Sequence, residues 1–200
     1  MKIQYLQDDI TVEYAASELT RYIKRITGGK ICLTIEKTQP YCISDDAIIL
    51  ALLEDLHLST EDVEDPLIDD VIDININNLK GYIAGSNTRS ILLGVYRYLR
   101  SAGCRWVRPG EDGEYIPEKD LLNHSFKYRK KADYPFRGEC IEGAVSFENI
   151  LDTIIWSPKV GLNMFMLEQI VPYNYMSRWY NRKANTVKKP IPMSFEEIAE

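Results

Sequence analysis

Apolar residues recur at helical spacing in two well-separated segments of this 200-residue chain. The apolar faces consist of Val12, Ala15, Ala16, Leu19, Ile23 and Ile26 in the first segment, and of Ile91, Leu92, Val95, Tyr96 and Leu99 in the second. The segments end at Gly28 and Gly103, and glycine supplies the left-handed stop of a helix. Two amphipathic helices must bury their apolar faces against a common layer, which constrains the chain to a layered fold.

Short strand-like runs surround both helices and complete the first part of the chain. They lie at residues 2–6, 31–35, 47–53, 71–76, 81–84 and 104–107. The resulting order, β-α-β-β-β-β-α-β, predicts an α+β domain in which two helices pack on one face of a mixed sheet. We expect this domain to span residues 1–125 and a second region to span residues 126–200.

The second region follows a different pattern. Its predicted elements are a strand at 134–141, a helix capped by Ser146 and a strand at 164–167. This β-α-β order is the building block of a parallel sheet or of a (β/α)8 barrel. Two strands cannot bury both faces of their sheet, and Ser194 with Glu197 forms a capping box that begins another helix. We therefore expect the start of a TIM barrel that is truncated in this chain.

The charge balance argues against nucleic acid as a partner. The net charge is −6, whereas a nucleic-acid binder needs a basic face to neutralise phosphates. Acidic residues cluster between Asp45 and Asp73, and basic residues gather at 127–131 and 178–189. Both kinds of run are interpreted as solvated surface.

Several kinds of site are not expected. The chain contains neither GxGxxG nor GxxxxGK[ST], the glycine-rich patterns that bind phosphates. With only two histidines, His57 and His124, a histidine-dependent triad or a histidine-rich metal site is improbable. The sequence therefore predicts no cofactor and no metal.

The cellular location is predicted from weak signals. The N-terminus lacks the apolar core of a signal peptide, and no apolar stretch approaches the roughly 18 residues of a membrane span. The four cysteines are scattered in apolar, strand-like surroundings and are interpreted as buried thiols. These features favour a cytoplasmic protein without a membrane partner.

The segment 137–143 holds the candidate ligand-binding residues Arg137, Glu139 and Glu142. In (β/α) barrels, residues at the carboxyl ends of the strands face the active site. Arg137 could donate two hydrogen bonds to sugar hydroxyls or to a carboxylate, and the two glutamates could accept from hydroxyls. The structural alternative is an Arg–Glu pair that closes the barrel floor. Glu168, at the end of the next strand, either binds ligand or only terminates the strand.

A polar loop with aromatic residues follows the second strand. It contains Tyr173, Tyr175, Arg178, Trp179 and Tyr180. Aromatic rings stack on the apolar faces of sugars, so Trp179 suits a saccharide subsite, but the loop also suits a packing lid. Cys140 is interpreted as a buried strand thiol, because no basic residue nearby in sequence would stabilise a thiolate. Glycosidases need two carboxyl groups about 5 to 10 Å apart, and we expect these catalytic acids beyond Glu200.

Three segments of the first half form a recognisable combination. They are Ala15-Ala16-x-x-Leu19, Gly94-Val95-Tyr96-Arg97-Tyr98-Leu99, and Gly103-Cys104-Arg105-Trp106 with Pro109. Together they resemble the non-catalytic N-terminal domain of several glycoside hydrolases. That domain precedes the catalytic barrel in family 20 β-N-acetylhexosaminidases, family 84 glucosaminidases and the α-glucuronidases of families 67 and 115.

The second half is similar to the first strand, helix and second strand of those barrels. The matching segments are Phe136-Arg137-Gly138, Glu142-Gly143 and Gly161-Leu162-Asn163-Met164-Phe165. In family 20, a comparable arginine contacts hydroxyls of the sugar at the cleaved position, and the resemblance assigns this role to Arg137. It implies an N-terminal fragment of a glycoside hydrolase, hexosaminidase- or glucuronidase-like, whose partners are an oligosaccharide or glycoside and the rest of its own catalytic domain. The alternative is a non-catalytic carbohydrate-binding or scaffold module.

Overall fold

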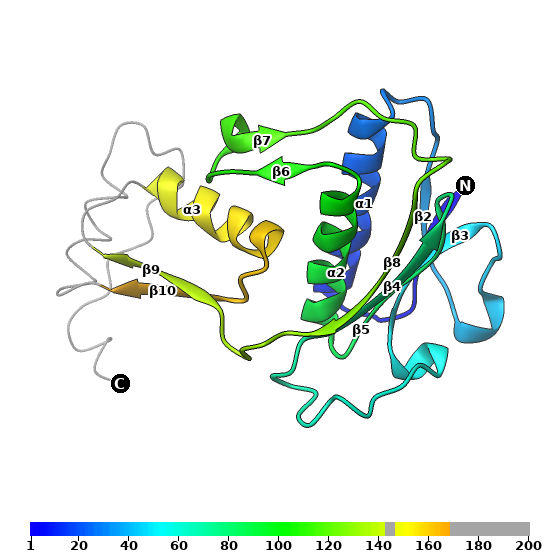
Figure 1. Ribbon diagram of the computed structural model, residues 1–200, viewed down its shortest axis with the longest axis horizontal. Coiled ribbons are helices and arrows are strands. Elements are labelled where there is room, and N and C mark those ends of the chain that lie inside the picture. The colour runs from blue at the N-terminus through cyan, green and yellow to red at the C-terminus, as the bar shows by residue number, and fades with distance from the viewer. Residues whose placement is uncertain (143–146, 169–200) are drawn as a thin grey trace, which may run out of the picture.

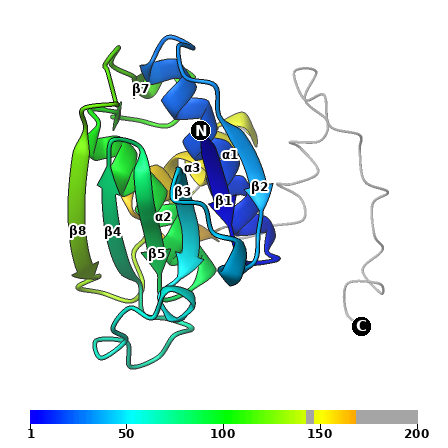
Figure 2. The same cartoon turned by 90° about the vertical axis from the view of Figure 1, so that its right-hand side faces the viewer.

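A mixed, mostly parallel sheet of six strands is the central layer of the part of the chain that the structure describes (Figures 1 and 2). This computed structural model describes residues 1–142 and 147–168. The strands, in their order across the sheet, are β2 (Thr34–Lys37), β1 (Lys2–Tyr5), β3 (Ala47–Leu52), β5 (Lys80–Gly85), β4 (Val71–Asn77) and β8 (Ser125–Lys131). Only β4 runs antiparallel to its neighbours in this sheet. The run of parallel strands makes the fold α/β, where the sequence predicted α+β.

The two predicted helices are confirmed and lie on one face of the sheet. They are α1 (Ile10–Ile26) and α2 (Thr88–Ser101). The Asp9 carboxylate accepts a hydrogen bond from the Thr11 amide at 2.7 Å, and the Asn87 side chain accepts from the Ser90 amide at 2.8 Å. These contacts satisfy amides that the first turn of a helix leaves unpaired. The apolar face predicted for each helix is buried.

Helix α2 approaches the sheet closely at Gly94. A Cβ at this position would lie 2.6 Å from Cγ2 of Ile83 in β5 and 3.2 Å from Cγ2 of Ile72 in β4. A side chain would therefore push the helix away from the sheet. Residues on another side of α2 line a cavity, so the position of this helix also shapes that cavity.

Strand β8 was not predicted, because its basic residues were interpreted as solvated surface. Phe126 and Tyr128 alternate with these bases along the strand, and both pack against the core. The expected domain boundary near residue 125 falls at the first residue of β8. The first sheet therefore extends past that boundary.

The bases of β8 neutralise part of the acidic segment that precedes β4. Arg129 pairs with Asp73 at 2.8 Å and with Asp62 at 2.6 Å, and Lys131 pairs with Asp69 and Glu64, both at 3.0 Å. The acidic and basic runs, separately interpreted as solvated, thus contact each other. A short 3₁₀ turn lies in the acidic segment at Glu54–Leu56.

After β8 come the predicted strand, helix and strand, although the first of these strands begins at Gly138 rather than at residue 134. They are β9 (Gly138–Glu142), α3 (Phe147–Trp156) and β10 (Met164–Glu168), and the two strands pair in parallel. A 3₁₀ turn at Ser157–Val160 follows α3. In Figure 1 this unit lies on the side of the main sheet that carries the helices, with α3 beside the hairpin of β6 (Arg105–Trp106) and β7 (Glu114–Tyr115). The described strands do not form a barrel.

The prediction of four buried thiols is wrong for three of them. Cys32, Cys42 and Cys140 are exposed, and Cys104 is buried. Cys32 precedes β2, an edge strand whose four residues are all exposed, and Cys42 lies in a short 3₁₀ turn. Apolar neighbours in sequence did not place these thiols in the core. Separately, no helix in residues 1–142 and 147–168 is long and apolar enough to cross a membrane.

The close approach at Gly94 predicts a strong effect of adding a side chain there. We expect Gly94→Val to lower the free energy of unfolding by about 2 kcal/mol, because its methyl groups must displace Ile83 or α2. Urea unfolding followed by circular dichroism measures this. Ser17→Val, at an exposed position of α1, is the matched control and should have a small effect. Equal effects of both substitutions would contradict the packing argument.

Candidate functional site

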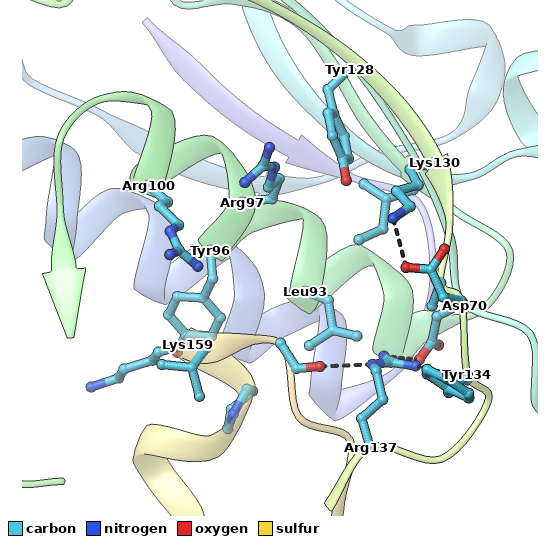
Figure 3. A pocket seen from close by; sticks show the side chains of 16 residues that line it. Asp70, Leu93, Tyr96, Arg97, Arg100, Tyr128, Lys130, Tyr134, Arg137 and Lys159 are labelled. Atoms are coloured by element: carbon cyan, nitrogen blue, oxygen red, sulfur yellow. Dashed lines mark hydrogen bonds and ion pairs between the residues drawn. The ribbon is translucent and has the colours of Figure 1, made fainter. Parts of the chain in front are cut away.

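A cavity of about 350 Å³ lies where α2, β8 and the segment before β9 meet. Its lining includes Leu93, Tyr96, Arg97 and Arg100 from α2, Tyr128 and Lys130 from β8, and Asp70, Tyr134, Arg137, Lys159 and Gly161 from the surrounding segments. Figure 3 shows Arg97 near Tyr128 on one side, while Arg137 and Asp70 meet on the other. The cavity is thus bordered by both regions of the chain.

Asp70, the residue directly before β4, is a buried carboxylate that joins the two regions. It is 1% exposed. One oxygen accepts hydrogen bonds from Arg137 Nη2 at 2.6 Å and Asn163 Nδ2 at 2.8 Å. The other accepts from Arg89 Nε at 3.0 Å and Ser90 Oγ at 2.9 Å. A buried charge without such partners would be strongly destabilising.

The partners of Asp70 keep it ionised. Burial by itself raises the pKa of the Asp70 carboxyl, because it disfavours the charged form. The hydrogen bonds from Arg137 and Ser90 and the charge of Arg89 act in the opposite direction. Their combined effect outweighs burial, and the pKa of Asp70 lies below its ordinary value.

Arg137 is engaged on all three nitrogens of its guanidinium group. Besides Asp70, it donates from Nε to the Gly161 carbonyl at 2.9 Å and from Nη1 to the Tyr134 carbonyl at 2.6 Å. Its backbone amide donates to the side chain of Asn163 at 2.9 Å. These contacts make Arg137 an anchor between segments. The sequence suggested a structural pair of Arg137 with a glutamate as one alternative, and the acid that pairs with Arg137 is Asp70. Binding of a sugar by Arg137 stays a prediction.

A second buried carboxylate, Glu114 in β7, fixes the other side of the β-α-β unit. It accepts from Lys159 Nζ at 2.7 Å, from Arg25 Nη1 at 2.9 Å and from the hydroxyl of Tyr22. Burial raises the pKa of Glu114, but the hydrogen bonds from Lys159 and Tyr22 outweigh it, and the pKa is lowered. Lys159 is itself buried, so each of the two charges would be destabilising without the other.

The predicted site residues lie at opposite ends of β9. Arg137 precedes the first residue of the strand, whereas Glu142 is its last residue and the register partner of Glu168 at the end of β10. Five residues of extended strand separate Arg137 from Glu142 by roughly 16 Å. The structure thus brings the backbones of Glu142 and Glu168 together and places Arg137 away from them.

The remaining two predicted residues have separate outcomes. Glu139 lies within β9, and its Oε2 atom is buried without a hydrogen-bond partner among the described residues. Burying a carboxylate oxygen without a hydrogen bond destabilises the fold. We therefore expect a donor for this atom from outside the described part of the chain. Trp179 and its aromatic loop lie outside the described residues.

Asp70, Arg97 and Arg100 were not predicted as site residues from the sequence. Asp70 was grouped with the solvated acidic run, although it directly precedes an apolar strand. Arg97 and Arg100 stand three residues apart on a predicted helix, which places them one turn apart on its surface. This spacing indicated a pair of neighbouring arginines, but it did not show which elements would face them across the cavity.

Comparisons with known proteins do not assign this site. No protein-family model matches the chain, and no curated protein matches it. In the parts of the chain that the structure describes, no three His, Cys, Asp or Glu residues are grouped so that they could hold a metal ion.

The buried position of Asp70 predicts a pH-dependent effect of its substitution. We expect Asp70→Asn to lower the free energy of unfolding at pH 7 by about 3 kcal/mol, because two arginines lose their charged partner. The pKa of Asp70 is lower in the folded protein, so its stabilisation is present above the unfolded value of about 3.9 and is lost as pH falls below it. The difference between wild type and variant should therefore shrink from pH 5 to pH 2.

Chemical unfolding across this pH range measures the difference. Asp112→Asn is the control, because Asp112 forms an exposed pair with Arg108 and exposed pairs contribute little. It should leave stability nearly unchanged at every pH. A stability difference for Asp70→Asn that does not vary with pH would contradict the ionised, buried carboxylate.

Proposed function

We propose that this chain is the N-terminal region of a glycoside hydrolase. In this proposal the six-stranded sheet with α1 and α2 is an accessory domain, and β9–α3–β10 is the first unit of a catalytic (β/α)8 barrel. The observation that carries the proposal is the register of Glu142 and Glu168 at the carboxyl ends of two adjacent parallel strands.

The carboxyl ends of parallel strands form the ligand-binding edge of α/β barrels. Neighbouring strands lie about 4.8 Å apart, so two glutamates in register at this edge could accept hydrogen bonds from neighbouring hydroxyls of one sugar. Hexosaminides and glucuronides are the proposed substrate class, as the resemblance of the sequence implies. The acids that cleave the glycosidic bond would come from other strands of the same barrel.

The surface of the β-α-β unit also supports an extended sheet. Leu151 and Ile154 of α3 and Met164 and Met166 of β10 are exposed. Parallel sheets in α/β proteins are covered on both faces, and β9 and β10 pair only with each other among the described strands. Further strands and helices would bury these side chains.

A second candidate is a non-catalytic carbohydrate-binding or scaffold module. The contacts of Arg137 favour it, because this residue is committed to Asp70 and to backbone carbonyls rather than open to a sugar. In that case the β-α-β unit would bind or present a glycan without cleaving it.

The two candidates separate in an assay of the full-length protein that contains this chain. On a panel of aryl glycosides we expect hydrolysis of an N-acetylhexosaminide or a glucuronide. Glu142→Gln and Glu168→Gln should each lower kcat/KM about tenfold or more, because each removes a charged acceptor. Glu61→Gln, in the exposed acidic segment, is the matched control and should have no effect.

The outcomes are distinct. Glycan binding without hydrolysis would favour the second candidate. Neither binding nor hydrolysis, or unchanged kinetics in both variants at the strand ends, would reject the proposed function.

A further inference from the structure

The cavity beside α2 contains two arginines that lack an acidic partner. The other cations in its lining are paired: Lys130 with Asp133, Arg137 with Asp70 and Lys159 with Glu114. Arg97 and Arg100 form no ion pair with any described residue, and Nε of Arg97 is buried without a hydrogen-bond acceptor there. In a protein with a net charge of −6, two unpaired arginines facing one cavity are unexpected.

The Arg97 side chain is held in place from one side. Its guanidinium carbon lies 4.4 Å from the centroid of the Tyr128 ring, and Tyr128 in turn stacks on Phe126 with a centroid distance of 5.9 Å. This cation–π contact orients the guanidinium group but accepts none of its N–H bonds. Figure 3 shows Arg97 and Arg100 projecting from the same helix, with Tyr128 beside Arg97.

A guanidinium group with open N–H donors can bind an oxyanion, which accepts its hydrogen bonds. Arginine binds phosphate and carboxylate groups through two parallel hydrogen bonds, and two arginines one helical turn apart can hold the same group. An anion in the cavity would accept hydrogen bonds from the guanidinium groups of Arg97 and Arg100 that line it.

We propose that this cavity binds a small molecule that carries a phosphate or carboxylate group, with Arg97 and Arg100 as the anion-binding residues. The volume of about 350 Å³ is at the lower end of the range for small-molecule sites and suits a ligand of monosaccharide size. Both regions of the chain border the cavity, so a bound ligand also contacts the junction anchored by Asp70. The inference does not depend on the proposed glycoside hydrolase function.

Isothermal titration of the protein tests the ligand class. The probes are inorganic phosphate, glucose 6-phosphate, glucuronate and, as the neutral control, glucose. We expect at least one of the three anions to bind with a Kd below about 1 mM and glucose to bind much more weakly. Preference between glucose 6-phosphate and glucuronate distinguishes a phosphate from a carboxylate ligand. Absence of binding by all three anions, or equal binding of glucose, would overturn the proposal.

Variants of the two arginines test the location of the site. Arg97→Gln and Arg100→Gln should each raise the Kd of the tightest anion about tenfold, and Arg97→Lys should have a smaller effect because it keeps the charge but loses the paired donors. Arg108→Gln, which removes the same charge from the exposed loop between β6 and β7, is the matched control. An equal loss in Arg108→Gln, or no loss in Arg97→Gln and Arg100→Gln, would show that the anion binds elsewhere.

A change in folding is separated from a change in binding by thermal unfolding. Arg97→Gln loses its contact with Tyr128 and is expected to lower the Tm slightly. Arg100 is exposed and has no side-chain hydrogen bond to a described residue, so Arg100→Gln should keep the Tm of the wild type. The binding loss in Arg100→Gln therefore decides the proposal even if Arg97→Gln is unstable.

Discussion

The arrangement of this protein depends on one buried charge, the carboxylate of Asp70. It joins three segments that are far apart in sequence: the start of β4, the first turn of α2, and the residues that open β9 and β10. A buried carboxylate is tolerated only when its hydrogen bonds are complete, so each segment must take the position that supplies its donor. The docking of the β-α-β unit follows from this requirement.

The second buried carboxylate, Glu114, makes the docking rigid from the other side. It collects Lys159 from the turn after α3, and Arg25 and Tyr22 from α1. Trp156 adds a hydrogen bond from its indole nitrogen to the Trp106 carbonyl at 3.0 Å. The cavity beside α2 lies between surfaces that these contacts fix. Asp70 and Glu114 are occupied by other cations, and Arg97 and Arg100 have no acidic partner among the described residues.

The two ends of β9 carry different groups. The amino end of β9 carries Arg137 and the anchor, whereas its carboxyl end carries Glu142 beside Glu168. Such a division is common in α/β proteins, where one edge of the sheet contributes stability and the other contributes ligand binding. The proposed glycoside hydrolase site lies at the carboxyl ends of β9 and β10. The proposed anion site lies in the cavity between α2, β8 and the segment before β9.

The sequence by itself determined the local elements. The apolar periodicity of α1 and α2 and the parallel β9–α3–β10 order depend on neighbours a few residues apart, and both were predicted. Arg137 and Glu142 were also identified as notable residues from their segment alone. Local spacing carries this information because helices and strands have fixed periods.

Only the tertiary structure decided which charges are surface and which are structural. Asp70 and Arg137 are 67 residues apart in sequence, and Asp73 and Arg129 are 56 apart. The sequence of an acidic run does not show whether a carboxylate is hydrated or is paired with an arginine. The same holds for β8, whose Arg129 and Lys131 pair with acids of a distant segment, and for the thiols that proved exposed. Burial of a charge is set by which distant segment lies opposite, and this is a property of the fold.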